Sequence, residues 1–218
     1  MNKSILFEIL NKKTQTELLN LLDNAWETMS TNQRDTIFSG LMSKEQFSFP
    51  ASADHTLKAV KAFQKCSLDG DYYAPFDINS RNYMDIPEET DAWFAKLDEL
   101  FIESTKLIRQ EEYQVALECF DILYELLVGI VDDEIIFADE LGSWMFTGDE
   151  KAYFTAYIHA AAATCSDEDF VDKAIFALHE DSDRSCSLKL YSVIKSMASP
   201  VQMAMVDQQV KARKIKVA

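Results

Sequence analysis

The residues best suited to chemistry in this 218-residue chain are carboxylates that crowd into one short stretch. Five of them, Asp132, Asp133, Glu134, Asp139 and Glu140, lie in the run DDEIIFADELGSWMF. On a helix, residues seven apart share a face, which would pair Asp132 with Asp139 and Asp133 with Glu140. Carboxylate oxygens are hard ligands that suit Mg²⁺ or Ca²⁺. The stretch is therefore a candidate metal site, and the alternative is an acidic helix start whose aromatic residues anchor it in the core.

A second pair of carboxylates, Glu118 and Asp121, lies in the run ECFDILYELL. The spacing resembles the second metal motif of the all-α nucleotide pyrophosphohydrolases. That resemblance implies a Mg²⁺-dependent hydrolase, in which acids on two neighbouring helices activate water for attack on a diphosphate. The facing motif would be Asp98, Glu99 and Glu103, one residue away from the usual Glu-Glu-x-x-Glu spacing. One residue turns a helical side chain by about 100°, so acids that simply face solvent are the alternative.

Other catalytic and cofactor motifs are not found in the sequence. It contains no GxGxxG, GxxxxGK[ST] or GxSxG pattern, so loops that cradle phosphate and nucleophile elbows are not expected. His179 stands near Asp181, Asp183 and Cys186, but without the spacing of a tetrahedral metal site. We therefore expect a protein without a cofactor and without catalytic residues.

The four cysteines, Cys66, Cys119, Cys165 and Cys186, form no CxxC pair. Three of them lie in or beside apolar helical patterns, which favours free thiols in a reducing compartment over a disulfide framework. The longest apolar run is far shorter than the roughly 20 residues of a membrane helix. These features predict a cytoplasmic protein.

One long connection, residues 67–90, interrupts the helical patterns. It holds two of the four prolines and four aromatic residues: Tyr72, Tyr73, Phe76 and Tyr83. Aromatic rings in a long loop pack either on the chain's own helices or on a partner. We favour packing on its own helices, and we keep these four residues, with Trp144, as candidate partner contacts.

The negative charge is concentrated in one third of the chain. The whole protein has a formal net charge of −16, yet residues 111–183 contain 19 acidic and only 2 basic residues. The tail, residues 184–218, contains 7 basic residues and 1 acidic residue. An acidic field of this size repels nucleic acid and anionic membranes and attracts basic partners. An acidic surface that only aids solubility is the alternative.

The elements that must position these residues are helices. Only 5 glycines and 4 prolines occur, too few for the many turns of a β-sandwich or barrel. Helix starts are indicated by Thr14 with Glu17, Ser30 with Gln33, Ser166, and Ser199 before Pro200. We expect an all-α fold of about ten helices, packed as antiparallel hairpins in an α-solenoid-like stack or a compact orthogonal bundle.

Two further resemblances concern the arrangement of these helices. The run EYQVALECF, with Tyr113, Ala116, Leu117 and Phe120, resembles the second helix of a tetratricopeptide-type repeat, and with the preceding helix it covers residues 91–128. The stretch Asp132 to Phe146 is similar to one in a family of uncharacterised bacterial all-helical proteins. These resemblances imply a helical-repeat-like part over residues 91–218. We expect a single domain, and the alternative is that residues 1–66 form a separate N-terminal helical subdomain.

The function expected from the sequence is therefore a helical protein-interaction module that presents an acidic face to a basic partner protein. A Mg²⁺-dependent hydrolase through Glu118 and Asp121 is one alternative. An acidic inhibitor or immunity-like protein, which occupies the basic groove of a nuclease, is the other.

Overall fold

The structure is a computed structural model that describes residues 10, 12–14, 17–18, 21–22, 52–82, 85–130, 135–137 and 145–217. Contacts divide the chain into two compact units, residues 1–49 and 50–218. In the first unit, the predicted capping box of Thr14 and Glu17 is confirmed. The N–H of Glu17 donates to the Thr14 hydroxyl at 3.3 Å, and the N–H of Thr14 donates to the Glu17 carboxylate at 2.9 Å. Ser30 and Gln33 lie outside the described residues.

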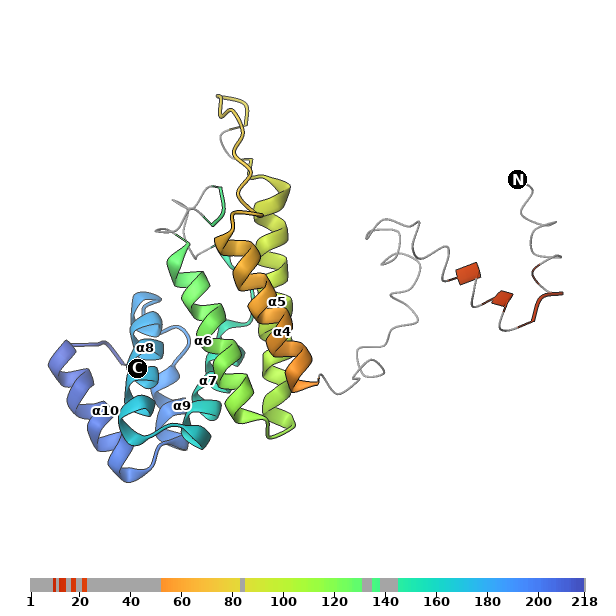
Figure 1. Cartoon of the computed structure of the whole chain (residues 1–218). Helices are drawn as coiled ribbons and strands as arrows, with labels where there is room; N and C mark the ends of the chain where they lie inside the picture. Colours follow the sequence, from red (N-terminus) through yellow and green to blue (C-terminus); the bar gives the residue numbers. More distant parts are fainter. Residues whose placement is uncertain are drawn as a thin grey trace. The chain divides into compact units, whose positions relative to one another are not determined.

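The described part of the second unit consists of helices and the loops that connect them. Figure 1 shows its seven helices, which are α4 (Ala53–Leu68), α5 (Glu88–Arg109), α6 (Tyr113–Gly129), α7 (Glu150–Thr164), α8 (Asp167–Asp183), α9 (Leu190–Met197) and α10 (Pro200–Arg213). The described residues form no strand, which confirms the all-α prediction. The prediction of about ten helices for the whole chain stays a prediction. None of the described helices has the length and apolar character that a membrane crossing requires.

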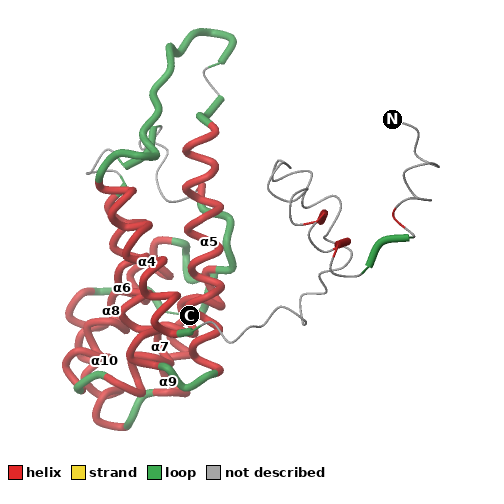
Figure 2. The backbone as a smooth tube through the Cα atoms, turned by 45° about the vertical axis from the view of Figure 1, so that its right-hand side comes forward, coloured by secondary structure: helices red, strands yellow, loops and turns green. Residues whose placement is uncertain are grey.

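The helices pack both on their neighbours in sequence and on the helix after the next one. Helices α5 and α6 are joined by residues 110–112, where Glu111 takes a left-handed conformation with φ 62°. Helix α4 lies alongside both of them in the two views of Figures 1 and 2. Helix α7 packs on α5 and α6, α8 and α9 pack on α7, and α10 packs on α8. Helix α4 contacts α5 and α6 and belongs to the second unit, whereas the domain division predicted from the sequence stays a prediction.

Aromatic side chains from three helices fill the centre of this unit. The rings of Phe101 and Tyr153 stack with centroids 5.0 Å apart, and those of Tyr124 and Phe154 stack at 4.4 Å. Burial of such rings dominates the apolar contribution to stability, and stacked pairs add about 0.5–1.5 kcal/mol each. Trp93 is fully buried, and its indole N–H donates to the Ser67 hydroxyl at 2.9 Å. The apolar faces of α5 and α6 therefore meet in one core.

The predicted N-caps of two C-terminal helices are present. The hydroxyl of Ser166 accepts from the N–H of Asp169 at 3.2 Å at the start of α8. Ser199 and Gln202 form a reciprocal capping box at the start of α10, with Pro200 as the first helical residue. Helix α9 begins differently, because its N-cap residue Lys189 is left-handed and provides no side-chain hydrogen bond.

Candidate functional site

The first predicted metal site lies outside the described residues. This applies to Asp132, Asp133, Asp139 and Glu140, and also to Trp144. Within that stretch only residues 135–137 and 145–146 are described, and Ile135, Ile136 and Phe146 are buried there. The candidate cation site therefore stays a prediction.

The second predicted pair of carboxylates faces two different neighbours. Glu118 pairs with Lys61 of α4 at 2.7 Å. Asp121 instead accepts a hydrogen bond from the Tyr157 hydroxyl at 2.9 Å and from the Lys173 ammonium at 2.6 Å. Glu118 thus binds a group on α4, whereas Asp121 binds groups on α7 and α8.

The acids that would face this pair also have partners of their own. Asp98 accepts from the Tyr153 hydroxyl at 2.7 Å, Glu99 pairs with Lys96 at 2.9 Å, and Glu103 pairs with Lys106 at 2.5 Å. Each carboxylate of the pattern that resembles the pyrophosphohydrolases is therefore hydrogen-bonded or ion-paired within the protein. A metal ion at this hairpin would have to compete with these groups for the oxygens.

Asp121 belongs to a pocket between α6, α7 and α8, with a volume of about 530 Å³. We call it the acidic pocket. Its carboxylates are Asp121, Glu125, Asp169 and Asp172. Its rings are those of Tyr124, Tyr157 and Phe176, and its one basic side chain is Lys173. Four acids against one base give the lining a net charge of −3, so the pocket favours cations.

The acidic pocket already binds one ammonium group, that of Lys173. The nitrogen lies 2.6 Å from the Asp121 carboxylate and 5.9 Å from the centre of the Tyr157 ring. A carboxylate on one side and a ring face on the other is a common way to bind an amine, through an ion pair and a cation–π contact. Burial, followed by the effect of Asp121, raises the pKa of Tyr157 far above its usual value. Tyr157 therefore keeps its proton and orients Asp121.

The other acids of the pocket are more open to solvent. Glu125 and Asp172 are exposed, and neither makes an ion pair with another described residue. Asp169 accepts from the Ser166 hydroxyl at 2.8 Å as part of the α8 cap. Glu125 and Asp172 are therefore the carboxylates of the pocket that are available to a ligand.

The aromatic loop packs on the protein itself, as favoured from the sequence. Tyr72 meets Phe63 edge-on, with centroids 5.6 Å apart. Tyr73 and Phe76 both pack on Phe137, at 6.1 and 5.3 Å. Tyr83 lies outside the described residues. Tyr72, Tyr73 and Phe76 thus bind the loop to the fold, and their role in partner binding stays a prediction.

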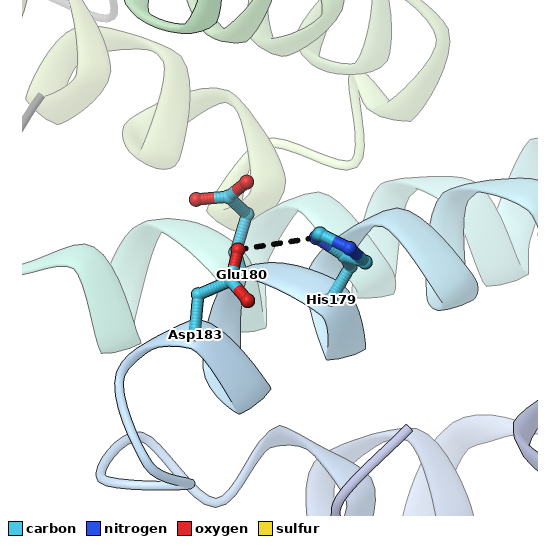
Figure 3. A group of neighbouring side chains, drawn as sticks. All are labelled: His179, Glu180 and Asp183. Carbon is cyan, nitrogen blue, oxygen red and sulfur yellow. Dashed lines mark ion pairs between the residues drawn. The ribbon is translucent and has the colours of Figure 1, made fainter. Parts of the chain in front are cut away.

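One group of possible metal ligands occurs in the described part of the chain, at the end of α8 (Figure 3). The ligand atoms of His179, Glu180 and Asp183 lie within 4.8 Å of one another, with His179 Nδ1 3.3 Å from the Asp183 carboxylate. Glu180 also binds Arg184 at 2.9 Å, so a metal would compete with a guanidinium for that carboxylate. Asp181, which the sequence places next to them, is buried and turned toward α9.

Most of the acidic pocket was not predicted from the sequence. Apart from Gly129, its α6 residues are Asp121, Tyr124, Glu125 and Val128, and its α8 residues are Asp169, Asp172, Lys173 and Phe176. Both sets follow the spacing i, i+3, i+4, i+7 of a single helix face. Mixed acidic and aromatic stripes with this period on two helices are the signal that was available in the sequence.

Both candidate sites are identified from the residues of this chain alone. No family model, no curated protein and no solved structure matches the chain.

Proposed function

We propose that this protein is a helical interaction module that binds a basic segment of a partner protein in the acidic pocket. The observation that carries the proposal is the bound ammonium of Lys173, at 2.6 Å from Asp121 and over the ring of Tyr157. A lysine or arginine of a partner offers the same chemistry to Glu125 and Asp172, which lack ion-pair partners among the described residues.

The size and walls of the acidic pocket support a side chain rather than a bare metal ion as the ligand. A volume of about 530 Å³ lies in the range of about 300–1,000 Å³ that is typical of sites for organic ligands. The rings of Tyr124 and Phe176 offer apolar contact for the methylene groups of lysine or arginine. Charge attraction to the pocket would raise the association rate and make it depend on salt.

The helical arrangement supports the same function. Each helix from α4 to α8 contacts the next helix in sequence, which supports the stack of hairpins to which the resemblance of residues 113–120 points. Such stacks offer extended surfaces to protein segments. The helical-repeat architecture and the use of its surface are both part of this proposal.

The proposal is tested with a labelled hexalysine peptide and a hexaglutamate peptide in fluorescence anisotropy, at low and high salt. We expect hexalysine to bind, hexaglutamate not to bind, and added salt to weaken the complex. The variant Glu125→Gln with Asp172→Asn removes two negative charges from the pocket. We expect it to weaken hexalysine binding at least about tenfold, which corresponds to about 1.4 kcal/mol.

A matched control separates the pocket from the overall charge. Asp77→Asn with Asp85→Asn also removes two negative charges, from exposed positions in the loop before α5. We expect this control to bind hexalysine almost as the wild type does. Equal losses in the two double variants would mean that only net charge matters, and the proposed site would be wrong.

A further inference from the structure

A second pocket, with a volume of about 400 Å³, lies between α5 and α7 and differs from the first in charge. We call it the basic pocket. Arg109, Lys151 and His159 line it, together with apolar contributions from Ile108, Ala152 and Ala156. One acid also lines it, Asp149, whose carboxylate accepts the N–H of Ala152 at 3.1 Å as the N-cap of α7. Lys151 is one of only two basic residues in residues 111–183, and in this pocket it lies near Arg109 of α5.

The position of Lys151 is not explained by the stability of its helix. It stands in the first turn of α7, where the positive end of the helix dipole disfavours a cation. Its ammonium makes no ion pair with any residue that the structure describes, whereas Lys173, the other base of this segment, is bound to Asp121. Arg109 is exposed and likewise makes no ion pair among these residues, although the last turn of α5 suits its charge.

The walls of the basic pocket indicate the kind of ligand. Lys151, Ala152, Thr155, Ala156 and His159 follow one stripe of α7, so the pocket is elongated, about 12 Å between its first and last residue along the helix. The hydroxyls of Thr105 and Thr155 donate to backbone carbonyls of their own helices, at 2.9 and 2.7 Å. The pocket therefore combines cationic groups with a mainly apolar floor.

We propose that the basic pocket binds a small organic carboxylate with an apolar body, whose head pairs with Lys151 or Arg109 and whose hydrocarbon part covers Ile108 and Ala156. An anion there would pair with the Lys151 ammonium, which makes no ion pair among the described residues. This site is separate from the acidic pocket, and it does not depend on the function proposed above.

The probe is octanoate, followed through the methyl signals of Ile108 in NMR titrations of the full chain. We expect octanoate to shift these signals at millimolar concentration. Acetate lacks the apolar body and octylammonium has the opposite charge, so we expect each of them to bind at least about tenfold more weakly. Lys151→Gln or Arg109→Gln should weaken octanoate binding at least about fivefold. Lys58→Gln removes an exposed lysine of α4 and should leave it unchanged.

The variant Lys151→Glu separates a ligand role from a structural one. An acid in the first turn suits the helix dipole, so we expect the melting temperature to rise while octanoate binding is lost. The proposal is overturned if octanoate leaves the Ile108 methyl signals unmoved, if octylammonium shifts them equally, or if octanoate binds Lys151→Glu as tightly as the wild type.

Discussion

The backbone N–H of Leu190 donates to the carboxylate of Asp181 at 2.7 Å, so that a residue of α8 caps α9. The same carboxylate accepts the N–H groups of Leu188 and Lys189, at 2.8 and 3.2 Å. Asp181 is only 2% exposed and thus replaces the side-chain cap that α9 lacks. One of the 19 acids of residues 111–183 is therefore a structural residue, and its charge is not part of the acidic surface.

We expect Asp181→Ala to lower the free energy of unfolding by about 1–3 kcal/mol, because three backbone donors would lose their acceptor. Urea denaturation followed by circular dichroism measures this change. Asp183→Ala, two residues away and exposed, serves as the control and should cost less than about 1 kcal/mol. Similar losses in the two variants would contradict the capping role of Asp181.

Two buried tyrosines should respond in opposite directions to the loss of their hydroxyl. The Tyr157 hydroxyl donates to Asp121 at 2.9 Å, so Tyr157→Phe should destabilise the protein by about 1–2 kcal/mol. The Tyr124 hydroxyl is buried and has no hydrogen-bond partner among the described residues. Tyr124→Phe should therefore be neutral or stabilise the protein by up to about 1 kcal/mol. Denaturation curves of both variants, measured side by side, test this; a clear loss for Tyr124→Phe would be inconsistent with an unpaired hydroxyl.

Gly148 lies just before α7, where no side chain fits. A Cβ at this position would clash with a carboxylate oxygen of Asp98 and with the rings of Phe146 and Tyr153. We expect Gly148→Ala to destabilise the protein by about 1–3 kcal/mol. Gly70 provides the contrast, because it has a left-handed φ of 83° and open space around it. Gly70→Asn should cost little, since Asn tolerates that conformation, and thermal unfolding of the two variants compares them.

Stability at alkaline pH should depend on Cys119. Burial raises the pKa of this thiol from about 9 to about 11. The folded state therefore favours the protonated thiol, so this contribution is complete below pH 9 and is lost as the pH rises toward 11. We expect the wild type to lose about 2 kcal/mol more than Cys119→Ala across this interval. Urea denaturation at several pH values gives the difference; parallel pH profiles would show that the thiol is not coupled to folding.

Much of the fold could be predicted because its causes are local. The capping pairs at Thr14, Ser166 and Ser199 place helix starts by hydrogen bonds that span only three residues. The apolar faces of α5 and α6 follow from helical periodicity, which the sequence shows directly. The start of α9 could not be predicted in this way, since its cap comes from Asp181, nine residues before Leu190.

The candidate site was less predictable because it depends on how helices face one another. The sequence shows that Glu118 and Asp121 are three residues apart, but not that one pairs with Lys61 while the other binds Lys173, 52 residues away. The total charge of residues 111–183 was evident. The sequence did not show how these acids are used. Asp181 is a buried cap, others line the acidic pocket, and two pair with Arg184.

The ammonium of Lys173 has a further consequence for partner selection, since it acts as a tethered competitor within the acidic pocket. Its effective concentration is set by the helix that carries it and does not fall on dilution. A partner with a single positive charge must displace it from Asp121 or use only the remaining acids. In the proposed function, a segment with several adjacent charges would occupy Glu125 and Asp172 without that exchange, and the pocket would then discriminate by the valence of its ligand.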